Sequence, residues 1–258
     1  MTELFLGKKL PSDLHRELRT FGEEWEIFAL KVLKKEAVHD APRFILVYDL
    51  ETTKEFEPKF HGFVSYDIDR NELARYGFVP TRFEKNIREN QAQTEEWLEV
   101  YEKPRHWANV MESMFHMPEG FAILVGANLL NFDLQKSDLR IGRLGEWKIE
   151  EERYSYLHDE RILEYRRITA SHRNRIFVRY NFDLLPLATQ VGFKKGEKKV
   201  DQLANALNAH FFKMPSPPTF LKPSLCFEEI NYCINDCLVE LELFAHLSNR
   251  ILKRTGFS

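Results

Sequence analysis

A short apolar segment that ends in two acidic residues is the strongest constraint on what this chain can fold into. Residues 44–48 are Phe, Ile, Leu, Val and Tyr, and Asp49, Leu50 and Glu51 follow them. So short a run rich in β-branched and aromatic residues predicts a buried central strand. Because side chains two apart on a strand point to the same face, Asp49 and Glu51 are expected to lie side by side at its end. Two carboxylates that close favour a divalent metal ion, although solvation in a turn explains them without one.

The length and composition of the chain fit one large domain. It has 258 residues, of which 43% are hydrophobic and 30% charged, which is enough to bury a full core. We expect this domain at residues 42–258, preceded by an N-terminal helical extension at residues 1–41. No apolar run approaches the ~18 residues of a membrane span, and the first residues lack the layout of a secretory signal. A cytoplasmic location and no membrane partner are therefore expected.

The net charge leaves the class of partner open. A formal net charge of −3 excludes neither a substrate class nor a partner class. A protein that coats nucleic acid is usually basic overall, whereas an enzyme that handles one strand end needs only a local basic patch. The densest basic patch in the sequence consists of Lys194, Lys195, Lys198 and Lys199.

The N-terminal extension is dominated by one predicted amphipathic helix with Ser12 as its N-cap. Apolar residues recur there at a spacing of four and three, at Leu14, Leu18, Phe21, Trp25, Phe28 and Val32. This stripe must be buried, and we expect it to pack on the domain that follows. A protein partner or self-association through the same helix is the alternative.

The three cysteines are clustered near the C-terminus, at Cys226, Cys233 and Cys237. An odd number of cysteines in such a cluster argues against a disulfide framework. Cys233 and Cys237 are one helical turn apart, but the sequence offers no second pair of Cys or His placed to complete a metal site. We interpret them as buried thiols.

The remaining pattern predicts alternating strands and helices. We expect strands at 60–67, 121–125 and 175–180, helices at 94–101, 105–115 and 200–211, a helix opening at Asp183, and a loop at 214–218. The strand at 60–67 is antiparallel to the first strand if their connection is short. Residues 140–179 are rich in mixed charge, which is typical of a solvated face; a hairpin facing nucleic acid is the alternative.

A second acidic segment follows the expected strand at 121–125. It has the form Asn-x-x-x-Phe-Asp, with Asn128, Phe132 and Asp133, although a turn rich in Asn and Asp gives a similar pattern. Asn-Phe-Asp recurs at 181–183, where capping of the next helix explains Asp183 without chemistry. We therefore prefer Asp133 as the functional acid.

The third acidic segment is the last predicted helix, at about 224–254. Its core stripe leaves Tyr232 and Asp236 nearly opposite, in line with Val239 and Leu243, so the helix is apolar on two sides. An ionised Asp236 that is buried and unpaired costs several kcal/mol, unless a partner or a metal ion compensates it. A solvated edge of the helix is the alternative.

Taken together, these three segments resemble the three motifs of DEDD-type 3′–5′ exonucleases. The likeness is closest to the proofreading domain of family B DNA polymerases and covers residues 43–248. Two further stretches support it: Asp-Leu-Glu-Thr-Thr at 49–53 and Asp-Leu-Leu-Pro-Leu-Ala at 183–188. The histidine subgroup carries His five residues before the last Asp, where this chain has Asn231, and Tyr232 stands four before it. The chain therefore resembles the tyrosine subgroup.

The resemblance implies an α/β fold with a ribonuclease-H-like mixed sheet flanked by helices. It implies a stand-alone enzyme that hydrolyses phosphodiester bonds from the 3′ end of single-stranded DNA, with RNA as a second possible substrate, and releases nucleoside 5′-monophosphates. Two divalent cations, Mg²⁺ or Mn²⁺, would be held by Asp49, Glu51, Asp133 and Asp236. The chain ends soon after Asp236, so we expect no polymerase module.

The resemblance also assigns roles around the metal ions. Tyr232 would orient the attacking water, since a pKa of about 10 makes it a poor base at neutral pH. Contacts with the terminal nucleotides are expected from Leu50, Thr52, Thr53, Asn128 and Phe132, and the lysines at 194–199 would follow the backbone of a single strand.

Two alternatives from other classes remain. The first is a nucleic-acid-binding module of the same fold that has lost cleavage, which the presence of all four acids and Tyr232 disfavours. The second is an endonuclease of the transposase type, which would have a different order of acids and no Tyr-x-x-x-Asp helix.

Overall fold

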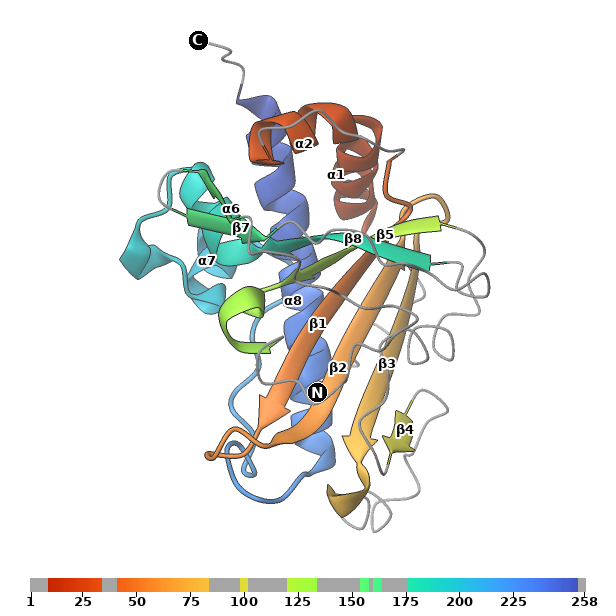
Figure 1. The fold of residues 1–258 in the computed structure, drawn as a ribbon, viewed down its shortest axis with the longest axis vertical. Coiled ribbons are helices and arrows are strands. Elements are labelled where there is room, and N and C mark those ends of the chain that lie inside the picture. Colours follow the sequence, from red (N-terminus) through yellow and green to blue (C-terminus); the bar gives the residue numbers. More distant parts are fainter. Residues whose placement is uncertain are drawn as a thin grey trace.

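The computed structural model describes residues 9–33, 41–83, 98–101, 120–133, 154–157, 160–163 and 176–254. Within these ranges, six strands form one sheet in the order β4-β3-β2-β1-β5-β8 (Figure 1). The strands are β1 (Phe44–Thr52), β2 (Pro58–Asp67), β3 (Glu72–Pro80), β4 (Leu98–Tyr101), β5 (Gly120–Gly126) and β8 (Ile176–Asp183). β6 (Tyr154–Leu157) and β7 (Glu160–Leu163) form a separate antiparallel pair.

The sheet is mixed, as expected for an α/β protein. β1, β2 and β3 form an antiparallel meander, whereas β5 pairs with β1 in parallel and β8 pairs with β5 in parallel. β1 is buried along almost its whole length because apolar side chains cover both of its faces. The predictions of a buried central strand and of an antiparallel second strand are confirmed.

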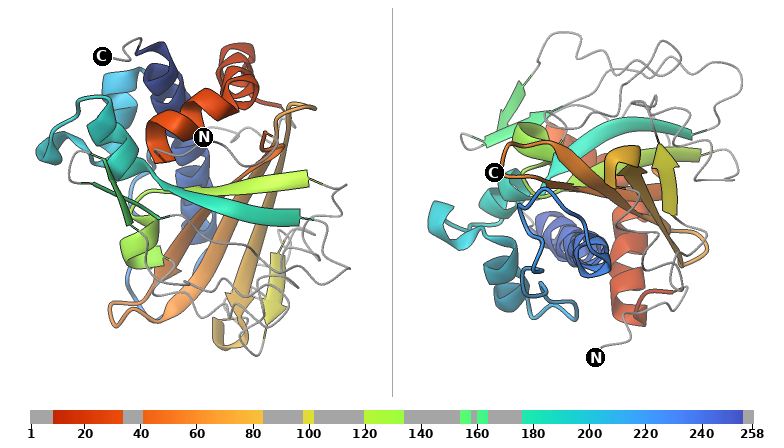
Figure 2. Two further views of the ribbon diagram at one scale, coloured as in Figure 1. Left: turned by 45° about the horizontal axis from the view of Figure 1, so that its top comes forward. Right: turned by 90° about the horizontal axis from the view of Figure 1, so that it is seen from below.

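One long helix, α8 (Phe227–Lys253), crosses a face of the sheet and contacts β1, β2 and β5. The helix begins with two glutamates and ends with Arg250 and Lys253, so its terminal charges complement the helix dipole. On one side of α8 lies α1 (Ser12–Glu23), and on the other lie α6 (Leu184–Gln190) and α7 (Val200–Leu207) (Figure 2). α8 is therefore buried on several sides.

The N-terminal segment joins the same apolar core. All six residues of its predicted stripe are buried, and Phe21, Trp25 and Phe28 pack edge-on against Phe182 or Phe244. The prediction that the stripe packs on the following domain is confirmed. The prediction of one continuous helix is wrong, because the chain breaks at Glu24 between α1 and α2 (Trp25–Leu33), close to Gly22, a weak helix former. The N-cap is Pro11 and not Ser12.

Two further expectations are corrected. Leu98–Tyr101 form strand β4 beside β3, and not the end of a helix, because four residues of this composition suit either structure and sheet pairing decides between them. The predicted helix at 200–211 ends at Leu207, where Asn208 adopts a left-handed conformation with φ of 54°. The predicted helix at 105–115 lies outside the described residues. None of the helices in the described ranges is long and apolar enough to cross a membrane.

Candidate active site

The three acidic segments of the sequence meet at one edge of the sheet. Because β1 and β5 are parallel neighbours, Asp49 and Glu51 near the end of β1 lie close to η3 (Leu129–Asp133), a turn of π-helix that follows β5. α8 packs on β1 and brings Tyr232 and Asp236 to the same place. We refer to Asp49, Glu51, Asp133 and Asp236 as the acid cluster.

The acid cluster is largely removed from water. Glu51, Asp133 and Asp236 are 4–5% exposed, and Asp49 is partly exposed. Burial first, and the charge of Asp49 second, raise the pKa of Glu51 and of Asp133 well above their usual ranges. The same two causes raise the pKa of Asp236 to about 7. Acids from two strand ends and a helix are therefore close enough to repel one another.

A fifth buried acid adjoins the cluster. Glu240, one helical turn after Asp236, is 4% exposed, and its Oε2 has no hydrogen-bond partner among the described residues. Burial, followed by the charge of Asp49, raises its pKa well above the usual range. The Asp236 Oδ1 is likewise buried without a partner in the described part of the chain.

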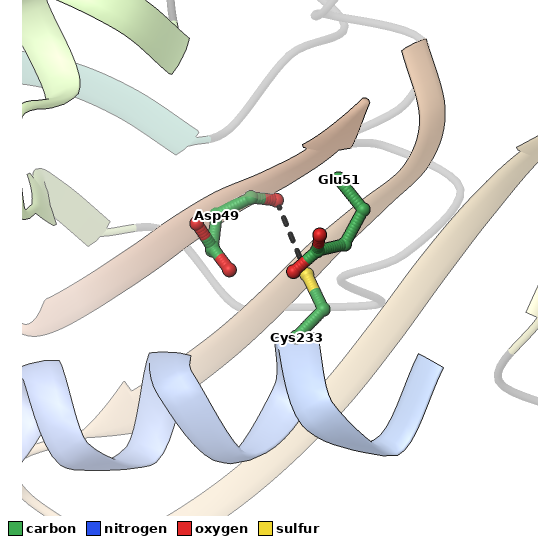
Figure 3. A group of neighbouring side chains, drawn as sticks. All are labelled: Asp49, Glu51 and Cys233. Carbon is green, nitrogen blue, oxygen red and sulfur yellow. Dashed lines mark hydrogen bonds between the residues drawn. The ribbon is translucent and has the colours of Figure 1, made fainter. Parts of the chain in front are cut away.

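Cys233 stands beside the first two acids. One ligand atom from each of Asp49, Glu51 and Cys233 lies within 4.8 Å of the other two, and the thiol donates to the backbone oxygen of Asp49 at 3.5 Å (Figure 3). All three cysteines are free, and Cys233 and Cys237 are buried as predicted. The sequence pattern did contain a signal for the location of Cys233, since it lies three residues before Asp236 and hence near it on the helix surface.

The cation in contact with the cluster, among the described residues, is Lys213. Its Nζ lies 2.7 Å from the Asp236 Oδ2 and 5.1 Å from the centre of the Tyr232 ring. Burial and the charge of Asp236 raise the pKa of Tyr232 above its usual value, which agrees with its expected weakness as a base. Sequence reasoning missed Lys213, because it lies in a loop with no periodicity, far along the chain from Asp236.

The two candidate Asn-Phe-Asp acids occupy different environments. Asp183 caps α6 by accepting from the backbone N–H of Leu185 at 3.0 Å, as predicted, and it also accepts from the backbone N–H of Asn128 at 3.1 Å. It thereby fixes the turn that leads to Asp133. Asn128 is exposed and has a φ of 61°, a left-handed conformation that Asn tolerates well.

Other predicted substrate contacts are divided between interior and surface. Leu50, Thr52 and Thr53 are at most 5% exposed, so their side chains face the interior. Phe132 is partly exposed and meets the ring of Phe56 edge-on at 5.8 Å. Phe56 is 51% exposed, and the sequence pattern did not single it out.

A second loop brings further exposed apolar side chains to the acids. Phe220, 38% exposed, meets the Tyr232 ring at 6.0 Å, and Leu221, 42% exposed, forms a bridge to Thr53. Buried Lys59 holds this loop by donating to the backbone oxygens of Thr219 and Ser224. Exposed rings therefore contact two of the predicted site residues, Phe132 and Tyr232.

The structure does not bring the basic patch to the acid cluster. Phe193, next to Lys194, packs under Arg250 at 5.9 Å, and at 1.5 Å per residue Arg250 lies about 21 Å along α8 from Asp236. Lys198 donates to the Thr189 hydroxyl, while Lys194 and Lys199 are exposed. Of the patch Lys194, Lys195, Lys198 and Lys199, no described contact reaches the acids.

Comparison of the sequence with protein-family models gives no match, and comparison with curated proteins gives none either.

Proposed function

We propose that this chain is a metal-dependent 3′–5′ exonuclease acting on single-stranded nucleic acid. The observation that carries the proposal is the acid cluster itself. Four carboxylates from three separate elements converge, and among the described residues Lys213 is the cation in contact with them. Burial, and then repulsion from Asp49, raise the pKa values of Glu51, Asp133 and Asp236. A protein that kept such an arrangement for stability alone would be expected to pair each acid.

The strand arrangement is compatible with the ribonuclease-H-like fold that the sequence motifs imply. An antiparallel meander of β1, β2 and β3 continues into the parallel strands β5 and β8. The acids stand at the carboxyl ends of β1 and β5, the edge of a parallel pair at which α/β proteins commonly gather functional groups.

The donor set fits hard divalent cations. Carboxylate oxygens are the ligands that Mg²⁺ and Mn²⁺ prefer, and a cation would supply a partner for the Asp236 Oδ1, which has no hydrogen-bond partner among the described residues. Asp49, Glu51 and Asp236 would hold one ion, and Asp49 with Asp133 the second. When bound, such ions activate the water that attacks the phosphodiester and neutralise charge on the leaving 3′-oxygen.

The residues around the cluster would position the strand end. Tyr232 contacts both Lys213 and Phe220, and these contacts would help to hold its hydroxyl for orienting a water rather than removing its proton. Lys213 opposes the protonation of Asp236 and so favours the ionised carboxylate that a metal ion requires. The exposed rings of Phe56 and Phe220 offer faces for unpaired bases, and stacking of this kind is tolerant of base identity.

The decisive experiment uses 5′-labelled single strands of DNA and RNA of one sequence, incubated with Mg²⁺, Mn²⁺ or EDTA. We expect ladders that shorten from the 3′ end with metal and intact strands with EDTA. The variant Asp133→Asn is the control for a contaminating nuclease. Cleavage by this chain should disappear in the variant, whereas cleavage by a contaminant would persist. Internal cuts, or digestion that chelation does not change, would refute the exonuclease proposal.

The ion pair between Lys213 and Asp236 favours a second candidate, a binding module in which an ammonium group takes the place of a metal ion. This candidate predicts that labelled single strands are retained in a gel-shift assay and stay intact with every metal. Because Lys213 is 37% exposed, it can move to solvent when a cation arrives, and the exonuclease is the first candidate for that reason.

A further inference from the structure

We propose that Asp49, Glu51 and Cys233 form a site for a thiophilic divalent ion, such as Zn²⁺ or Cd²⁺, inside the acid cluster. The proposal concerns binding, which requires no nuclease activity. Its consequence, inhibition of cleavage, rests on the proposed function. Figure 3 shows the three side chains converging from β1 and α8.

The geometry is that of a mixed oxygen and sulfur site. The three potential ligand atoms lie within 4.8 Å of one another, so small side-chain rotations suffice to bring them onto one ion. The thiol is held in place by its hydrogen bond to the Asp49 backbone oxygen at 3.5 Å. Asp49 is the partly exposed member and offers the route of entry.

Gly62 on β2 makes this position available to the thiol. Gly62 pairs with Asp49 in the sheet, and a Cβ at residue 62 would lie 2.5 Å from the Cys233 sulfur. Any side chain there would push the thiol away from the acids. The close approach of helix and strand, and with it the donor set, therefore depends on a glycine.

A second observation points to a cation at this place. The Asp236 Oδ1, one turn along α8 from Cys233, is buried and has no hydrogen-bond partner among the described residues. Asp236 is 4% exposed, and its charge acts on Glu51. Asp236 is not one of the three residues within 4.8 Å of one another, but its charge acts on Glu51, so its oxygen is close enough to become the fourth ligand that Zn²⁺ prefers.

The donor chemistry separates two classes of metal ion. Mg²⁺ binds oxygen and gains little from sulfur, whereas thiolate ligands favour Zn²⁺ and its softer relatives. On binding, a metal–sulfur bond replaces the S–H bond of Cys233 and the proton leaves to water. Because Asp49 and Glu51 belong to both sites, a thiophilic ion held by Cys233 would exclude the ions needed for cleavage.

Binding is tested directly by ultraviolet absorption, without substrate. Metal-free full-length protein is titrated with Cd²⁺, and we expect a thiolate-to-cadmium charge-transfer band that saturates at one ion per chain. Cys233→Ser should abolish the band, and Asp49→Asn should weaken binding at least about tenfold. Cys226→Ser is the matched control, because Cys226 contacts Thr219 and lies outside the cluster, so its band should be unchanged.

Two outcomes would overturn the site. One is the absence of a band in the wild type; the other is a band that persists in Cys233→Ser, since it would come from Cys226 or Cys237. If Cys233→Ser fails to fold, as judged by circular dichroism, Cys233→Ala replaces it, because alanine places no unpaired hydroxyl in the core.

A cleavage assay in Mg²⁺ then tests the consequence. Zn²⁺ added in small excess over protein should stop cleavage by the wild type and by Cys226→Ser, and the Cys233 variant should need at least about tenfold more Zn²⁺. Equal sensitivity of all three proteins would show that Cys233 plays no part in inhibition. If no cleavage occurs in any condition, the proposed function fails while the absorption titration still decides the metal site.

Discussion

α8 carries two groups of titratable side chains, and the two groups differ in the charge of the residues around them. In its C-terminal half, Glu242 and His246 are matched by partners of opposite charge or by hydrogen-bond donors. In its N-terminal half, Asp236 and Glu240 face other acids. Glu242 is as deeply buried as Asp236 and Glu240, while His246 is partly exposed, so the contrast between the three acids isolates the effect of partners.

The matched group joins α8 to α1 and to the loop after α7. Glu242 accepts from the backbone N–H groups of His210 at 2.6 Å and Phe211 at 2.7 Å, and its Oε1 also lies 2.7 Å from the His210 Nδ1. Glu17 contacts the His246 Nδ1 at 2.7 Å. Although burial acts to raise the pKa of Glu242, the hydrogen bond with His246 and those from His210 and Phe211 lower it below the usual value.

In the acid cluster, burial and the like charge of neighbouring acids both raise the pKa values of Glu51, Asp133 and Asp236. The pKa of Asp236 rises to about 7 because burial and Asp49 outweigh its ion pair with Lys213. The fold can therefore supply partners to a buried acid, and it does so two turns further along the helix. Groups whose pKa values are raised by burial and like charge beyond what their partners offset are characteristic of functional sites, and this contrast is the physical basis of the proposed nuclease site.

The largest expected effect is the loss of cleavage when an acid of the acid cluster is replaced. Asp236→Asn should lower the cleavage rate on the order of 10³-fold or more, as loss of a metal-site carboxylate does. It should leave the metal-free melting temperature unchanged or higher, because it removes repulsion and leaves Lys213 able to reach water. The rise in melting temperature that Mn²⁺ gives the wild type should shrink, because that rise reflects binding to the native state.

Melting curves of Asp236→Asn and wild type, in EDTA and in Mn²⁺, check these expectations. A drop of several kcal/mol that does not depend on metal would assign Asp236 to structure through its pair with Lys213.

The next prediction is that the same Glu→Gln substitution changes the stability of the protein in different directions at residues 242 and 240. Glu242→Gln removes the charge that pairs with His246 and should destabilise the fold by about 3 kcal/mol. Glu240→Gln, half a turn away, should be neutral or stabilising without metal, because burial and the charge of Asp49 raise the pKa of Glu240 and disfavour its ionised form, which the substitution removes. Urea unfolding of both variants in EDTA measures the difference. Equal losses of stability would remove the distinction between the two groups.

The sequence was sufficient to predict the features that depend on local pattern. β1, its antiparallel neighbour, the buried N-terminal stripe and the cap at Asp183 all follow from periodicity or from a turn residue. The order of the three acidic segments along the chain also led to the residues that the fold gathers. Each of these signals lies within a window of a few residues, where the side-chain period determines which face is buried.

The features that the sequence did not reveal depend on contacts between distant segments. Lys213 reaches Asp236 from a loop, and Cys233 meets Asp49 across 184 residues. The sequence predicts buried thiols, which the structure confirms, but it does not indicate that the Cys233 sulfur lies within 4.8 Å of carboxylate oxygens of Asp49 and Glu51 on β1. The network of Glu17, His210, Glu242 and His246 likewise joins α1, the loop after α7 and α8, and the local pattern of each segment does not indicate that these side chains meet.

A pH titration of stability sharpens the comparison at the matched group. Burial acts to lower the pKa of His246, but Glu17 and Glu242 raise it from 6.5 to about 9. Because its pKa is raised, protonated His246 contributes stability that is fully present below about pH 6.5 and is lost as the pH rises through about 9. The free energy of unfolding should change by roughly 2 to 3 kcal/mol over this range. Melting temperatures between these pH values should fall more for the wild type than for His246→Gln.

Asp236 also binds a proton more tightly in the folded state, so the contribution of its protonated form to the free energy of unfolding is lost as the pH rises through about 7. Carrying the titration out in Asp236→Asn, with and without His246→Gln, separates the two steps. If the melting temperature falls equally steeply with pH above pH 8 in the presence and absence of His246, the assigned role of the histidine is contradicted.

The smallest expected effect concerns Asp183, which belongs to the matched class although it neighbours the acid cluster. Its carboxylate accepts from two backbone N–H groups, so Asp183→Ala should destabilise the protein by about 2 kcal/mol. Asp183→Asn keeps an acceptor oxygen and should recover about half of that loss. Cleavage should fall less than about tenfold in both, because only the Asn128 turn is released, whereas Asp133→Ala should remove cleavage with little loss of stability. The reverse pattern, with activity tied to Asp183 and stability to Asp133, would exchange the assignments of the two acids and move the metal site from η3 to the start of α6.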